Sequence, residues 1–87
     1  MSEYVAARYA KSVLQEARSA EPDVATKLIN DLLRDLSSLQ GSSDASAQTF
    51  TAIRSLSLSH DHPRSLRLRE WNAATQAAEA WCQSAFK

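Results

Sequence analysis

One stretch, residues 22–40, constrains the fold more than any other part of the chain. Its apolar residues recur at intervals of three and four positions: Ala25, Leu28, Ile29, Leu32, Leu33, Leu36 and Leu39. This spacing places all of them on one stripe of an α-helix, whereas a β-strand would divide them between its two faces. The stripe is broad, so the helix must bury it against other parts of the protein.

Both ends of this stretch carry residues that are typical of helix ends. Pro22 suits the first helical position, because its missing N–H would have no partner there. Gly41 suits the left-handed position that often follows the last residue of a helix. We therefore expect a helix that begins at Pro22 and ends near Gln40.

Two further helices are expected on either side of it. Ser2 can cap a first helix that ends near Arg18. Its expected buried stripe consists of Ala6, Tyr9, Ala10, Val13, Leu14 and Ala17. A third helix, residues 45–58, is expected after a cap at Ser43 or Asp44. Its helical period is weaker, and the stripe expected for it consists of Ala47, Phe50, Ile53, Arg54 and either Leu56 or Ser57.

The last helix is expected between Pro63 and Ala85. Its apolar residues form a seam spaced alternately three and four apart: Trp71, Ala74, Ala78, Trp81 and Ala85. Such a seam is typical of helices that pack closely along their length. Large rings that alternate with alanines predict that a neighbouring helix comes close and that the rings fill the remaining space.

Residues 4–14, YVAARYAKSVL, resemble the opening helix of the ATP synthase delta subunit family. The likeness stops at Glu16, and the chain that follows does not continue it. The resemblance therefore supports a helix in this region and carries no function over to this chain.

The composition agrees with an all-α fold. With 87 residues the chain is expected to form a single domain, residues 1–87. It has only one Gly and two Pro, too few for the turns of an all-β protein. We predict a compact bundle of three to four amphipathic helices with antiparallel neighbours and no sheet.

The chain is expected to be cytoplasmic. It has a single cysteine, Cys82, which fits a reducing compartment because no internal disulfide can form. Its start lacks the basic and apolar regions of a secretory signal. No run approaches the ~18 apolar residues of a membrane span, so no membrane association is expected.

No enzymatic chemistry is expected. His60, Asp61 and His62 are metal-type ligands, but zinc usually has four, and no second pair occurs. A polar turn with Asp61 as a helix cap is the simpler interpretation. Cys82 has no accompanying base motif and is expected to be packed. We predict no catalytic residue, metal, cofactor or small-molecule substrate.

Binding of another protein is the function that the sequence favours. The expected contact lies on the last helix, with Trp81 and Phe86 as anchors and with Arg64, Arg67 and Arg69 around them, since Trp and Arg dominate many interfaces. Trp71 is expected in the core. The domain would be an adaptor, inhibitor or regulatory subunit, and the partner could be a second copy of the chain.

A nucleic-acid-binding regulator is the alternative. It would use the same three arginines, because Arg contacts phosphate in a bidentate manner. A formal net charge of zero, with ten basic and ten acidic residues, weakens this alternative.

Overall fold

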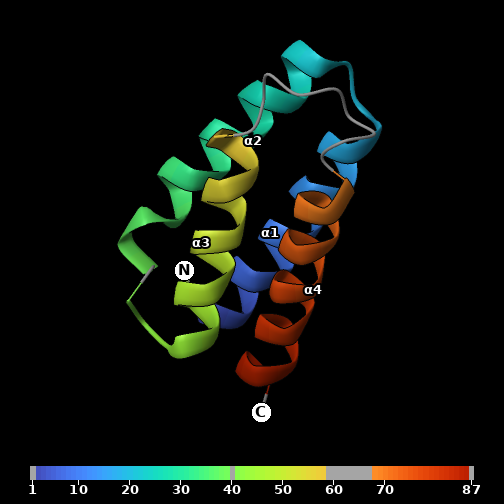
Figure 1. The fold of residues 1–87 in the computed structure, drawn as a ribbon. Helices are drawn as coiled ribbons and strands as arrows, with labels where there is room; N and C mark the ends of the chain where they lie inside the picture. The colour runs from blue at the N-terminus through green and yellow to red at the C-terminus, as the bar shows by residue number, and fades with distance from the viewer. Residues whose placement is uncertain (1, 40, 59–67, 87) are drawn as a thin grey trace.

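The computed structural model describes residues 2–39, 41–58 and 68–86, and these form four α-helices and no β-strand. The elements are α1 (Glu3–Ser19), α2 (Pro22–Leu36), a short 3-10 helix η1 (Ser37–Leu39), α3 (Asp44–Leu58) and α4 (Leu68–Ala85). Consecutive helices run in opposite directions (Figure 1). The expected all-α bundle is confirmed.

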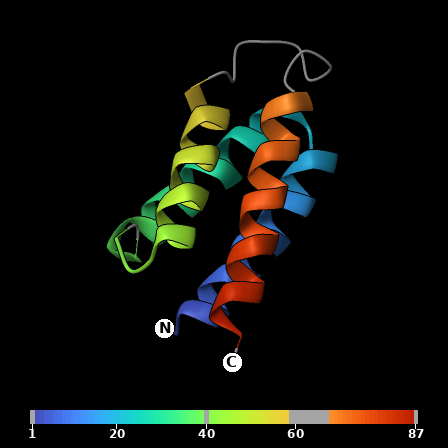
Figure 2. The same ribbon diagram turned by 60° about the horizontal axis from the view of Figure 1, so that its bottom comes forward.

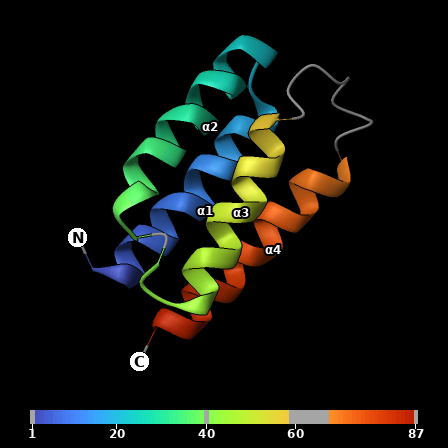
Figure 3. The ribbon, with the colours of Figure 1, turned by 60° about the vertical axis from the view of Figure 1, so that its left-hand side comes forward.

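The helices form a closed ring of contacts. α1 packs against α2 and α4, and α3 packs against the same two helices. Figure 3 shows α1 and α3 between their neighbours, with α2 and α4 on opposite sides. Because the helices alternate in direction, the start of α1 and the end of α4 lie together at one end of the bundle (Figure 2).

The starts of α1 and α2 follow the expected chemistry. The Ser2 side chain accepts a hydrogen bond of 3.2 Å from the Val5 N–H, which would otherwise have no partner within the helix. Pro22 occupies the first turn of α2. Both of these predictions are confirmed.

The end of α2 differs from the expectation. The α-helix stops at Leu36, and the last apolar residue of the stripe, Leu39, belongs to η1. Gly41 does not have a positive φ angle, so its predicted left-handed conformation is wrong. The physical reason is that the tighter 3-10 turn already redirects the chain, and the Ser42 N–H donates to the Leu39 carbonyl at 3.1 Å.

α3 begins with a reciprocal cap made by two serines. The Ser43 hydroxyl accepts from the Ser46 N–H at 3.1 Å, and the Ser46 hydroxyl accepts from the Ser43 N–H at 2.9 Å. This is the geometry of a capping box, with Ser46 in the place usually taken by Glu or Gln. It satisfies backbone N–H groups that the helix cannot satisfy internally.

The core is built on the predicted seam of α4. Trp71 and Trp81 are each 1% exposed, and the alanines between them, Ala74 and Ala78, are fully buried. The core position of Trp71 is confirmed. The facing surface of α1 is also made mainly of small residues: Ala6, Ala7, Ala10, Val13, Leu14 and Ala17. Small side chains let the two backbones approach, and the indole rings fill the space that is left.

Two of the predicted stripes differ from the buried faces at a few positions. On α1, Tyr9 is 38% exposed and Ala7 is buried in its place. On α3, Ala47 and Arg54 are exposed. The buried face there consists of Ser46, Thr49, Ile53 and Leu56.

Thr49 is buried because its hydroxyl finds backbone partners on both sides. Its oxygen lies 2.8 Å from the Ala45 carbonyl oxygen in α3 and 3.0 Å from the Ala77 carbonyl oxygen in α4. A buried hydroxyl costs free energy only when it lacks a partner. Thr49 therefore links the two helices from within the core.

We expect the Trp71→Ala substitution to lower the free energy of unfolding by about 3–5 kcal/mol, the usual cost of removing a buried aromatic ring. Asn72→Ala, on the exposed face of the same helix turn, should change it by about 0.5 kcal/mol or less. Urea denaturation followed by circular dichroism measures both. A loss below about 1 kcal/mol for Trp71→Ala would show that the ring does not fill the core.

Candidate functional site

Phe86 is the most exposed of the large apolar side chains that the structure describes, at 68%. Its backbone N–H donates to the Cys82 carbonyl at 3.0 Å, which holds it against the last turn of α4. Its ring lies against Tyr4 of α1, with ring centroids 5.2 Å apart and a tilt of 47°. An aromatic pair therefore lies at the end of the bundle where the two termini meet.

The pair borders an open groove between α1 and α4. The larger part of this groove has a volume of about 600 Å³ and is lined by Tyr4, Arg8, Lys11, Ser12, Gln15 and Cys82. An adjoining hollow of about 230 Å³ is lined by Tyr4, Cys82, Gln83 and Phe86. Tyr4 and Cys82 line both hollows, so we treat them as one surface, the α1/α4 groove.

The groove has an apolar end and a basic end. Tyr4, Cys82 and Phe86 form the apolar end, and Arg8 and Lys11 follow along α1. The Arg8 guanidinium carbon lies 5.8 Å from the centroid of the Tyr4 ring, within reach of a cation–π contact. Among the residues that the structure describes, no ion pair joins Arg8 or Lys11 to a carboxylate.

Cys82 lies on the floor of the groove as a protonated thiol. Its partial burial raises the pKa of the thiol, although the nearby charges of Lys11 and Arg8 lower it and that of Glu79 raises it further. The thiolate is the nucleophilic form, and a raised pKa makes it scarce at neutral pH. Cys82 therefore contributes apolar surface to the groove.

A three-way hydrogen-bond cluster holds the helices together beside the groove. The Glu3 carboxylate accepts from the Trp81 indole N–H at 2.8 Å and also accepts from the Ser43 hydroxyl. These two bonds, first that from Ser43 and then that from Trp81, lower the pKa of Glu3. The cluster fastens the start of α1 to the start of α3 and to the last turns of α4.

Trp81 therefore does not have the exposed position expected of an anchor. Its ring is buried and its one hydrogen-bond donor is already bonded to Glu3. A direct contact with a partner would require the bundle to open. Phe86 is the predicted anchor that does lie at the surface.

Arg69 is the one of the three predicted arginines that the structure describes, and it does not lie beside Phe86. Arg69 is exposed in the first turn of α4, and it lines a separate shallow hollow with Leu68 and Asn72. Phe86 follows the other end of the helix, roughly 25 Å away at 1.5 Å per residue. Arg64, Arg67, His60 and His62 lie outside the described residues. Their predicted roles, and the nucleic-acid alternative that rests on the arginines, stay predictions.

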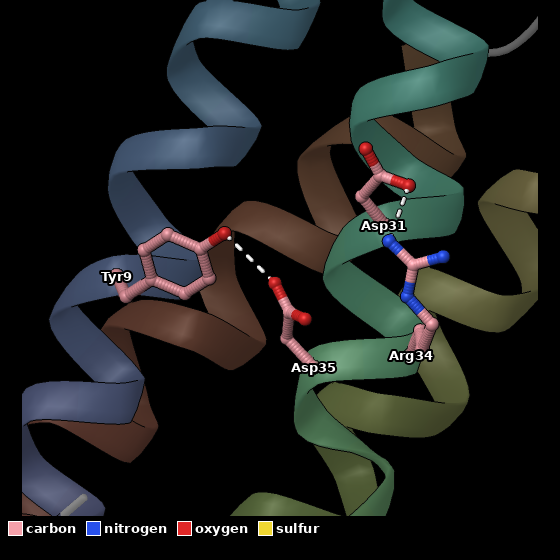
Figure 4. A network of polar contacts seen from close by, with 4 residues as sticks. All are labelled: Tyr9, Asp31, Arg34 and Asp35. Carbon is pink, nitrogen blue, oxygen red and sulfur yellow. Dashed lines mark hydrogen bonds and ion pairs between the residues drawn. The ribbon is translucent and has the colours of Figure 1, made fainter.

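A second polar cluster joins α1 to α2 on another face (Figure 4). The Tyr9 hydroxyl donates to Asp35 at 3.0 Å, and Arg34 donates to Asp31 at 2.9 Å. The hydrogen bond to Asp35 raises the pKa of Tyr9, with partial burial and the negative charges of Asp35 and Asp31 as smaller causes. These contacts explain why Tyr9 lies at the surface, since its hydroxyl reaches a carboxylate there.

The described residues contain no cluster of His, Cys, Asp or Glu side chains that could hold a metal ion. Within the same parts of the chain, no helix combines the length and the apolar character needed to cross a membrane. No family model, curated protein sequence or solved structure matches this chain in comparisons with known proteins.

Sequence reasoning did not identify the α1 side of the groove. Tyr4, Arg8 and Lys11 are spaced four and three apart, so they share one edge of α1. Arg8 is exposed and Lys11 is half-buried. The sequence did not indicate that the end of α4 would lie beside them.

The Glu3 cluster predicts a specific dependence of stability on pH. Because folding lowers the pKa of Glu3, its stabilising contribution is complete above the ordinary value of about 4.5 and is lost as the pH falls through the lower pKa of the folded protein. Glu3→Gln should therefore lower the melting temperature at neutral pH. The difference from the original chain should disappear in acid. Glu16→Gln, on the exposed face of α1, is the control. Equal melting temperatures of the Glu3→Gln and original chains at neutral pH would contradict this role.

The Tyr9–Asp35 contact predicts an alkaline titration. Stabilisation from this contact should be complete below the ordinary tyrosine value of 10.0 and should be lost as the pH rises through the raised pKa of Tyr9. In a Tyr4→Phe background, Asp35→Asn should move the ionisation of Tyr9 to lower pH, measured by phenolate absorbance. Asp23→Asn, an exposed change on the same helix, should leave it in place. An unchanged titration in Asp35→Asn would exclude the hydrogen bond.

Proposed function

We propose that this chain is a small protein-binding domain whose contact surface is the α1/α4 groove, with Phe86 as its anchor. One observation carries the proposal: a phenylalanine ring that is 68% exposed borders an open groove and is held in place by a neighbouring tyrosine. Exposed aromatic rings that lie against a concave surface are typical anchors of protein interfaces.

The groove suits a helical or extended segment of a partner better than a small molecule. Sites for small molecules are enclosed and bury most of their ligand. This groove is open, and it follows the line between two packed helices. A segment that lies along it would cover Phe86 and Tyr4 together and remove both rings from water.

The rigidity of the surface supports the same function. Trp81, next to Cys82 in α4, is buried and bonded to Glu3, so the last turns of α4 are fixed to the start of α1. A surface that is already ordered loses less conformational entropy on binding. An adaptor, inhibitor or regulatory subunit could use such a surface without any chemistry of its own.

Photocrosslinking tests this function. A benzophenone amino acid placed at position 86 should yield a discrete crosslinked protein in a lysate of the source organism. The same group at position 68, where Leu68 is also exposed but lies at the other end of α4, should not yield it. Purified partner should then bind the original chain at least tenfold more tightly than Phe86→Ala, since loss of an anchor commonly costs about 2 kcal/mol or more.

The same experiment measures the oligomeric state. A crosslinked species of twice the mass of the chain, together with a dimer in light scattering, would identify a second copy as the partner. Equal crosslinking from positions 86 and 68, or crosslinking to nucleic acid alone, would overturn the proposed surface.

A further inference from the structure

The residues that line the α1/α4 groove indicate the chemistry of a partner that would fit it. Its aromatic end is followed along α1 by Arg8 and then Lys11, which lie one and two helical turns from Tyr4. Neither cation has a carboxylate partner in residues 2–39, 41–58 and 68–86. Along the groove, the apolar end at Tyr4 is thus followed by two positively charged side chains.

We infer that the groove binds an acidic amphipathic helix, one that places an apolar side chain against Phe86 and Tyr4 and carboxylates against Arg8 and Lys11. This inference rests on the proposed function, because it names the class of partner for the same surface. The two claims rest on different observations. The inference rests on the charge and the spacing of Arg8 and Lys11 along α1, whereas the proposed function rests on the exposure of the Phe86 ring.

The charge around the groove favours a carboxylate ligand. Lys11 and Arg8 are the cations that act on the Cys82 thiol at its floor, and Glu79 is the acidic group that opposes them. Glu3, in the first turn of α1, is bonded to Trp81 and Ser43. Among the described residues, two cations and one carboxylate therefore act on the Cys82 thiol, and this balance favours an anionic ligand in the groove.

The spacing favours a helix as the form of the ligand. The described elements offer no strand edge that an extended peptide could extend. A helix of the partner that lies along the groove between α1 and α4 would contact it through residues spaced three and four apart. An apolar residue followed by acidic residues one and two turns away would match Tyr4, Arg8 and Lys11 in register.

The test is a selection from a display library of helical peptides randomised along one face. The original chain should enrich peptides that carry an apolar residue with Asp or Glu one and two turns away. Arg8→Glu combined with Lys11→Glu should instead enrich Lys or Arg at those positions. Lys27→Glu combined with Arg54→Glu changes the net charge equally on exposed positions of α2 and α3, and it should keep the acidic preference.

Affinities of one selected peptide complete the test. By fluorescence anisotropy, the Arg8→Glu, Lys11→Glu chain should bind it about tenfold or more weakly, because each attraction becomes a repulsion of similar size. The matched control should change the affinity less than about twofold. Higher salt should weaken binding of the original chain, whose attraction to the peptide is screened, and should strengthen that of the charge-reversed chain, whose repulsion is screened.

The outcomes separate this inference from the proposed function. Enriched apolar peptides without acidic residues, whose binding is lost in Phe86→Ala, would overturn the acidic class and leave the groove as a protein-binding surface. If the original chain and Phe86→Ala enrich the same peptides equally, or if the original chain enriches none, both the acidic-helix inference and the proposed function are overturned. If the chain instead self-associates through Phe86, Arg8 and Lys11 and thereby excludes the peptides, the acidic-helix inference is overturned and the partner is a second copy of the chain.

Discussion

The packing of two tryptophans of α4 against the small side chains of α1 is the constraint on which the rest of the structure depends. Trp71 and Trp81 are almost completely buried, and the alanines between them let the α1 backbone approach. The dispersion attractions between such closely packed atoms are individually weak but numerous. In a chain of 87 residues, which buries a smaller share of its surface than a larger protein, these rings supply much of the available core.

Burial of Trp81 creates a requirement of its own. Its indole N–H leaves water and needs an acceptor, which Glu3 supplies from the start of α1. The same carboxylate accepts from Ser43, so the cap of α3 is joined to the first and last helices. This arrangement brings the ends of the described chain together. It also leaves Phe86 beyond the last buried position, at the surface, where the Tyr4 ring lies against it.

Much of this fold could be predicted from periodicity, and the errors have identifiable causes. The stripe of α2 and the seam of α4 were predicted because long apolar side chains at helical spacing have no other place to go. Tyr9 was misplaced in the core, and the burial of Thr49 was not predicted, because hydropathy ignores where a hydroxyl finds its partner. Tyr9 reaches Asp35 at the surface, whereas Thr49 reaches two backbone carbonyls inside the core.

The groove could be predicted only in part, because it belongs to two helices that are distant in the sequence. The exposure of Phe86 follows from its position after the seam, and that much is visible in one segment. The basic edge depends on antiparallel packing of α1 against α4, which places Tyr4, Arg8 and Lys11 beside the end of α4. The separation of Arg69 from Phe86 follows from the same geometry, since the length of α4 puts them at opposite ends of the bundle. The surface expected on the last helix alone grouped Phe86 with an arginine at the far end of the same helix, whereas the groove between α1 and α4 places the cations of α1 near Tyr4 and Cys82.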